Sequence, residues 1–278
     1  MRGRLAERLL YGILFAMILL GGMQLLASQI EPPNRGMSEM PCPPPVGRSA
    51  RVARTVFLTL AGRPDESRDW ADLCFFRTEN DALIRRGVQP HVVFLGDSIT
   101  HYWDRFEPQF YTEGLLNRGL AGQASPQVLL RLQPDALTLK PRMIHLMVGL
   151  NDIVGIRGWS RPDDYRNNIE SIVTLAKAGG VTVIIGAIPP AKNDGWATGV
   201  HPVARIREMN DWLRAIAQRD GLVFADYWAA MAAPDGTMRR ELADDGVHPN
   251  AAGYAVMTPI AQAAIAEAER RRATAAPR

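Results

Sequence analysis

The fold class follows first from residues 91–100, which read HVVFLGDSIT. The run from Val92 to Leu95 is wholly apolar, and a short apolar run without alternation is typical of a strand buried on both faces of a parallel sheet. Gly96 ends this run, so the chain is expected to turn sharply there. Ser98 is therefore predicted to lie just beyond the carboxyl end of a buried strand.

Three further runs of the same kind predict strands at 143–148, 181–187 and 222–226. Amphipathic stretches between and around the strands predict helices at 70–86, 125–132, 162–178, 203–219 and 250–271. Pro162 suits the first turn of a helix, and the pair Gly179-Gly180 suits a helix end. This alternation predicts an α/β fold with a parallel sheet covered by helices on both faces.

Ligands of such sheets bind beyond the carboxyl ends of the strands. Glycine-rich polar loops are expected at this edge, namely 96–100 (GDSIT), 117–122 (NRGLAG) and 149–152 (GLND), and the segment 244–250 (DDGVHPN) precedes the last helix. The sequence thus places its chemically useful side chains where a parallel sheet binds its ligand.

Ser98, His248 and Asp245 have the residue types of a catalytic triad. A serine hydroxyl is a weak nucleophile unless a base lies within hydrogen-bond reach, and that base is usually a histidine oriented by a carboxylate. Asp245 precedes His248 by three residues, so one turn of chain brings the two side chains together. We predict Ser98 as nucleophile, His248 as base and Asp245 as the residue that orients the base.

Acyl transfer also requires hydrogen-bond donors for the oxyanion that develops on the substrate. The predicted donors are the Ser98 amide, the Gly119 amide and the Asn151 side-chain amide. Each of these residues also has a purely structural explanation: a helix-capping serine, a turn glycine and an Asx-turn asparagine. Asp245 and His248 alone would also fit a hydrogen-bonded pair at a helix entry.

Four blocks in order, GDSIT, NRGLAG, GLND and DGVHPN, resemble those of the SGNH (GDSL-type) hydrolases. The resemblance extends from about residue 91 to 264 and is strongest to the branch of platelet-activating-factor-acetylhydrolase-like and carbohydrate acetylesterase-like members. It implies a flavodoxin-like three-layer α/β/α sandwich, metal-free ester hydrolysis, and the roles given above for Ser98, His248, Asp245, Gly119 and Asn151. Leu150 stands where the family usually has threonine, and we expect only a change in packing there.

The charge distribution argues against nucleic-acid binding. The 278-residue chain is 47% hydrophobic and has a formal charge of +3. Residues 55–269, however, hold 21 Lys and Arg against 26 Asp and Glu, so the body is acidic and only its ends are basic. Nucleic-acid binders concentrate basic residues along a contact face.

The N-terminal part of the chain predicts export. Residues 9–27 are almost wholly apolar and follow Arg2, Arg4 and Arg8, so residues 1–30 are interpreted as a signal-anchor helix or, alternatively, a cleaved signal peptide. The proline-rich linker 31–54, the hydrolase domain 55–272 and the tail 273–278 follow. An anchored chain would hold its catalytic domain outside the cytoplasmic membrane, whereas signal cleavage would secrete it.

The sequence thus predicts a serine esterase for short acyl groups, acetyl above all, acting on a small-molecule or carbohydrate ester. The alternatives are a lysophospholipase or thioesterase with a longer acyl preference, and a membrane-tethered binding protein without catalysis. The resemblance implies that no cofactor or metal is needed, and Cys42 and Cys74 lack the spacing of a structural zinc site. The sequence leaves open whether these cysteines pair and what the oligomeric state is.

Overall fold

The computed structural model describes residues 69–111, 114–158, 160–192 and 201–275. The chain divides into the units 1–44 and 45–278, and every described residue belongs to the second. The predicted N-terminal helix, the linker 31–54, Cys42 and the last residues of the tail lie outside the described residues. Within them, no helix has the length and apolar character needed to cross a bilayer.

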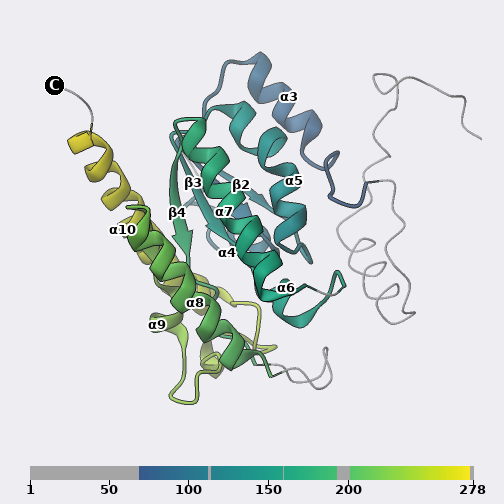
Figure 1. Cartoon of the computed structure of the whole chain (residues 1–278), viewed down its shortest axis with the longest axis vertical. Helices are drawn as coiled ribbons and strands as arrows, with labels where there is room; N and C mark the ends of the chain where they lie inside the picture. The colour runs from purple at the N-terminus through teal and green to yellow at the C-terminus, as the bar shows by residue number, and fades with distance from the viewer. Residues whose placement is uncertain (1–68, 112–113, 159, 193–200, 276–278) are drawn as a thin grey trace, which may run out of the picture. The chain divides into compact units, whose positions relative to one another are not determined.

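The second unit is built on a five-stranded, all-parallel sheet (Figure 1). Its spatial order is β2-β1-β3-β4-β5, with strands β1 (Val92–Gly96), β2 (Leu115–Gly119), β3 (Met143–Met147), β4 (Thr182–Gly186) and β5 (Val223–Ala225). The chain order reverses beside β1, between β2 and β3, and such a reversal opens a crevice at the carboxyl ends of the strands.

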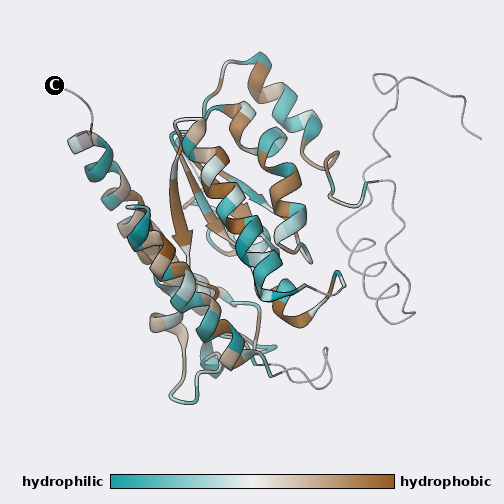
Figure 2. Ribbon diagram, in the orientation of Figure 1, coloured by the Kyte–Doolittle hydropathy of each residue, from teal (hydrophilic) through white to brown (hydrophobic). Residues whose placement is uncertain are grey.

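Helices cover both faces of this sheet and make it the middle of three layers. Val93 and Leu95 of β1 pack in a core with α5, α7 and α8, whereas Val92 and Phe94 pack in a second core with α4, α9 and α10. Strand β4 is accordingly coloured as hydrophobic along most of its length in Figure 2. The helices are α3 (Arg77–Arg85), α4 (Ser98–Phe106), α5 (Ser125–Asp135), η2 (Leu137–Leu139), α6 (Leu150–Val154), α7 (Pro162–Ala178), α8 (Pro202–Arg219), α9 (Tyr227–Met231), η3 (Arg240–Leu242) and α10 (Ala251–Ala275).

The predicted three-layer α/β/α fold and the four predicted strands are confirmed. The sequence reading missed β2, because Asn117 and Arg118 look like loop residues. Arg118 is nevertheless almost completely buried, and it donates hydrogen bonds to Glu79 and Asn80 of α3. A buried strand with a paired arginine has no apolar signature, so its pattern resembles that of a loop.

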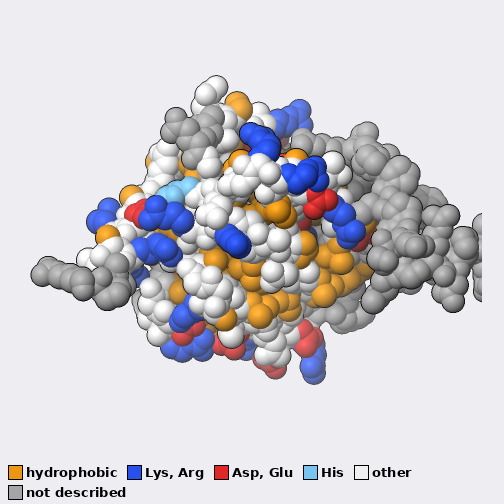
Figure 3. Space-filling view, turned by 90° about the horizontal axis from the view of Figure 1, so that it is seen from above, with side chains coloured by type: hydrophobic (Ala, Val, Ile, Leu, Met, Phe, Trp, Pro, Cys, Tyr) orange, Lys and Arg blue, Asp and Glu red, His pale blue; other side chains and the backbone are white. Residues whose placement is uncertain are grey.

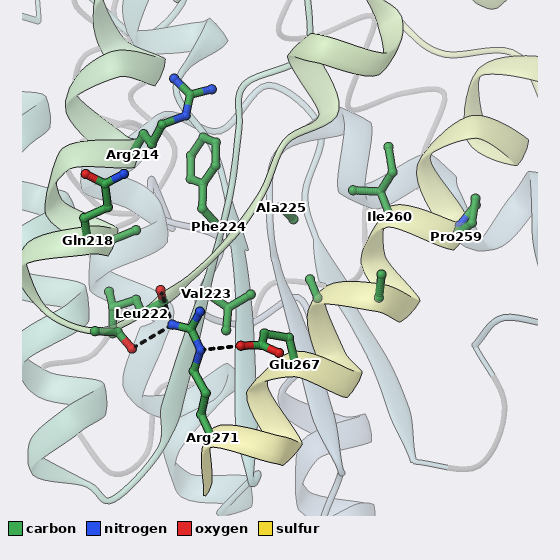
Figure 4. Close-up of a pocket in the computed structure, with 14 residues that line it drawn as sticks. Arg214, Gln218, Leu222, Val223, Phe224, Ala225, Pro259, Ile260, Glu267 and Arg271 are labelled. Atoms are coloured by element: carbon green, nitrogen blue, oxygen red, sulfur yellow. Dashed lines mark hydrogen bonds and ion pairs between the residues drawn. The ribbon is translucent and has the colours of Figure 1, made fainter.

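The free edge of β5 lies in a groove of about 860 Å³ between α8 and α10 (Figure 4). Val223, Phe224 and Ala225 line it, and Arg271 donates a hydrogen bond to the Leu222 carbonyl at 3.1 Å. None of the predicted site residues lines this groove.

Figure 3 views the molecule from the end of the sheet where the strands begin, and basic side chains surround hydrophobic ones on this surface. The predicted site lies at the opposite end of the sheet, beyond the carboxyl ends of the strands.

Candidate active site

Ser98 occupies the sharp junction between β1 and α4. A Cβ on Gly96 would lie 2.3 Å from both the Met147 carbonyl oxygen and Thr100 Oγ1, so only glycine fits here. The Asp97 carboxylate accepts the Ile99 N–H at 3.0 Å and caps α4. Ser98 is thus the first residue of the helix, where backbone amides lack partners within the helix and carry partial positive charge.

The structure brings together the three side chains predicted as a triad. Nε2 of His248 lies 3.0 Å from Ser98 Oγ, and Nδ1 lies 2.7 Å from Asp245 Oδ2. The other oxygen of Asp245 accepts the N–H groups of Val247 and His248 at 2.9 and 2.7 Å. With Asp245 ionised, Nδ1 carries the ring proton and donates it, so Nε2 can accept the hydroxyl proton of Ser98.

Asp245 is held in its ionised form. Partial burial alone would raise the pKa of its carboxyl, but the hydrogen bonds from the His248 ring and from the two amides outweigh this effect and hold the pKa below 3.8. The side chains of Asp245 and His248 are 53% and 31% exposed, and the ring of Tyr102 lies edge-on to His248 at 5.8 Å. The site is therefore shallow and open to solvent.

Asn151 follows the carboxyl end of β3 and is the second residue of the short helix α6, which Gly149 precedes. Gly149 has φ of 146°, and a Cβ there would lie 2.6 Å from Ile188, so the turn requires glycine. The side-chain amide of Asn151 donates one hydrogen to the Gln123 carbonyl at 2.8 Å. Its second amide hydrogen has no hydrogen-bond acceptor within the described part of the chain. Leu150 beside it is buried in the core, which agrees with a packing role.

Gly119 does not have the geometry predicted for an oxyanion donor. It is the last residue of β2, and its N–H donates to Asn117 Oδ1 at 2.8 Å, while its carbonyl lies 3.0 Å from His101 Nδ1. A Cβ would lie 2.2 Å from the His101 backbone nitrogen, so glycine is required for packing against α4. The prediction for Gly119 is corrected on this point, because its amide is already occupied.

Gly122 is a candidate oxyanion donor that the sequence did not reveal. It follows β2 with φ of 78°, and its N–H has no hydrogen-bond partner among the residues that the structure describes. The next residue, Gln123, supplies the carbonyl that holds Asn151. Recognition of β2 would have pointed to Gly122 instead of Gly119. Gly119 belongs to the strand, whereas Gly122 lies in the loop beyond the carboxyl end of the strand.

Two buried carboxyls, Asp97 and Asp152, support the loops of the site. Asp152 accepts hydrogen bonds from the N–H and the hydroxyl of Ser125 at 2.9 and 2.6 Å, which ties α6 to α5. Burial raises the pKa of Asp97 to about 7 and that of Asp152 to about 6, against the opposing effect of these hydrogen bonds.

The raised pKa of Asp97 predicts a pH-dependent stability. The Asp97 carboxyl loses its proton near pH 3.8 in the unfolded chain and near pH 7 in the folded chain. The contribution of Asp97 to the free energy of unfolding is therefore complete below pH 3.8 and is lost as the pH rises through 7. We expect Asp97→Asn to reduce the fall in unfolding free energy between about pH 5 and pH 8 by about 2–3 kcal/mol. Denaturant unfolding at both pH values measures this difference. Asp163→Asn, at an exposed position, is the control, and an equal fall in wild type and Asp97→Asn would contradict the prediction.

The residue types gathered at this site suit acyl transfer. No cluster of three or more His, Cys, Asp or Glu side chains suited to a metal ion occurs in the described ranges. Ser98, His248 and Asp245 form one hydrogen-bonded chain, and the amides of Ser98, Gly122 and Asn151 follow the carboxyl ends of the neighbouring strands β1, β2 and β3. A tetrahedral oxyanion formed at Ser98 is the species that this arrangement can stabilise.

Comparisons with known proteins agree with this chemistry. The model of the GDSL-like lipase/acylhydrolase family matches residues 94–256. The chain is 33% identical to a candidate acylhydrolase from Bacteroides fragilis, with a TM-score of 0.68, and covers 99% of that chain and 72% of its own length. It is 31% identical to a GDSL-like lipase from Bacteroides thetaiotaomicron, with a TM-score of 0.67 and coverage of 98% of that chain and 71% of its own.

A third solved structure, an acetyl xylan esterase, shares the fold at 20% identity and a TM-score of 0.51, with 62% of this chain and 98% of that chain covered. No curated protein matches the chain.

Proposed function

The chain belongs to the GDSL-like lipase/acylhydrolase family, and from this premise we propose that it is a serine esterase that removes short acyl groups, acetyl above all, from carbohydrate or small-molecule esters. The observation that carries the proposal is the continuous hydrogen-bonded chain from Ser98 Oγ through His248 to Asp245. That arrangement makes a serine hydroxyl nucleophilic at neutral pH.

The proposed reaction forms and hydrolyses an acyl-enzyme. Ser98 Oγ attacks the ester carbonyl while its proton passes to His248 Nε2, and the negative charge moves to the carbonyl oxygen. Donors for this oxyanion are the amides of Ser98 and Gly122 and the second amide hydrogen of Asn151. Collapse of the intermediate breaks the ester bond, and His248 returns the proton to the departing alcohol. Water then attacks the acyl-enzyme as His248 takes its proton, and collapse of this second intermediate breaks the bond to Ser98 Oγ, which regains the proton from His248 as the acid is released.

The open geometry of the triad supports a bulky polar alcohol and a small acyl group. The exposed edges of His248 and Asp245 leave room for a large substrate to approach from solvent, whereas a long acyl chain needs an enclosed apolar pocket to gain binding energy. The acetyl xylan esterase with the same fold makes an acetylated polysaccharide a reasonable substrate class. The alternative is a lysophospholipase or thioesterase.

A series of p-nitrophenyl esters tests the acyl-length preference. We expect kcat/KM for the octanoate to be no higher than that for the acetate, since extra methylenes that stay in water do not contribute the about 0.8 kcal/mol each that burial in an apolar pocket would supply. The rates follow from release of p-nitrophenol, with a panel of O-acetylated glycans as natural counterparts. A preference for the octanoate would remove the acetylesterase assignment in favour of the long-chain alternative.

We also propose that the apolar segment 9–27 anchors the enzyme in the membrane with its catalytic domain exported, which places it near envelope or environmental polysaccharide. N-terminal sequencing of the native protein tests this: a retained segment supports the anchor, and a first residue directly after Ala27 would show a cleaved signal and a secreted enzyme.

A further inference from the structure

A network of buried polar side chains lies directly behind the site. Its centre is Arg131 of α5, which is completely buried. Nη2 of Arg131 donates to the Gly96 carbonyl at 2.8 Å, Nε donates to Gln123 Oε1, and Nη1 lies 3.3 Å from Asp135 Oδ2. One guanidinium thus joins the end of β1, two residues before the nucleophile, to the loop that follows β2.

Gln123 is the member of this network that reaches the oxyanion donors. Its backbone carbonyl accepts the Asn151 side-chain amide at 2.8 Å, and its N-terminal neighbour is Gly122. Its side chain is held at both ends: Oε1 accepts from Arg131, and Nε2 donates to the Ala71 carbonyl and to Asp72 Oδ2, both at 3.1 Å. The side chain is fully buried, so these partners fix the residue without competition from water.

Burying such a network costs free energy that an apolar side chain would avoid. Burial lowers the pKa of Arg131 to about 10, against the opposing effect of Asp135, so the guanidinium stays charged at neutral pH inside the fold. Apolar residues of similar volume often stabilise a core better than a buried ion pair does. The main benefit of burying Arg131 is therefore structural: its hydrogen bonds fix the positions of Gly96 and Gln123.

We propose that Gln123 is a positioning residue of the oxyanion hole: braced by Arg131, it holds the carbonyl that orients the Asn151 amide and the peptide of Gly122 relative to Ser98. This inference rests on the proposed esterase function. It assigns Gln123 no contact with substrate, and its effect passes through Asn151 and Gly122.

The replacement Gln123→Met tests the proposal, because methionine has a similar length and keeps the backbone carbonyl but releases the side chain from Arg131, Ala71 and Asp72. We expect kcat for p-nitrophenyl acetate to fall about 10–100-fold while KM changes less than about threefold, since a displaced donor weakens transition-state binding alone.

Gln127→Met is the matched control. Gln127 is equally buried, bonds the Trp70 carbonyl and the Ala124 amide, and has no bond to Asn151. Its kcat should stay within about twofold of wild type at a similar loss of thermal stability. Equal losses of kcat in the two variants would reduce Gln123 to a structural role and overturn the proposal.

Two further measurements separate this inference from the proposed function. In an Asn151→Ala background, Gln123→Met should lower kcat by less than about threefold, because the side-chain amide that Gln123 orients is then missing. Fully additive losses of kcat in the double variant would contradict the positioning role. Hydrogen exchange of residues 120–123 should be faster in Gln123→Met than in wild type or Gln127→Met. Exchange does not require turnover, so an inactive wild type would refute the esterase while unchanged exchange would refute the positioning role.

Discussion

Ser98→Ala is expected to lower kcat for p-nitrophenyl acetate by about 10⁴-fold or more. The variant loses the Oγ that lies 3.0 Å from His248 Nε2, so no acyl-enzyme can form. Any residual rate would come from attack by water, assisted by the backbone amide at position 98 and the amides of Gly122 and Asn151. Wild-type protein should also bind one fluorophosphonate per chain at Ser98, as seen by intact mass, and the variant should bind none.

Ser171→Ala in α7 is the control for this replacement and should retain both hydrolysis and labelling. Turnover by Ser98→Ala near the wild-type rate would exclude Ser98 as nucleophile. A folded wild-type protein that neither hydrolyses esters nor takes the label would instead favour the binding-protein alternative, in which the triad geometry remains but is not used.

His248→Ala should cost about as much as loss of the nucleophile, about 10⁴-fold in kcat, since Ser98 then lacks the group that takes its proton. The double variant Ser98→Ala/His248→Ala should be no slower than either single variant, because the two side chains act as one unit. Steady-state hydrolysis by all three proteins measures both effects.

His91→Gln is the matched control. His91 pairs with Glu269 at the opposite end of β1 from Ser98, and its replacement should leave kcat unchanged. If His248→Ala retained more than about a tenth of the wild-type rate, a different base would have to activate Ser98.

Much of this site could be predicted because its residues lie in short local motifs. The turn after β1 is formed by Gly96 and Asp97, the two residues that precede Ser98. Asp245 and His248 are three residues apart, so their hydrogen bond forms within a single turn of chain. In each case neighbouring residues set the geometry, and the residue types alone identify the chemistry.

The errors arose where geometry depends on distant residues. Arg118 makes β2 resemble a loop because its partners, Glu79 and Asn80, lie about forty positions earlier in the chain. The choice of Gly119 rather than Gly122 as the predicted donor followed from that missed strand, since the end of β2 distinguishes the two glycines. The bracing of Gln123 by Arg131 likewise depends on how α5 packs against β1, which the sequence does not reveal without the fold.

The separation of 150 residues between Ser98 and His248 has a consequence for biosynthesis. A ribosome makes the chain from its N-terminus, so Ser98 emerges 150 residues before His248. The central strand β1 must also wait for β2 and β3, its two neighbours in the sheet. We therefore expect the growing polypeptide to be unreactive until the segment that holds His248 docks, so that the appearance of fluorophosphonate reactivity would report completed folding of the site.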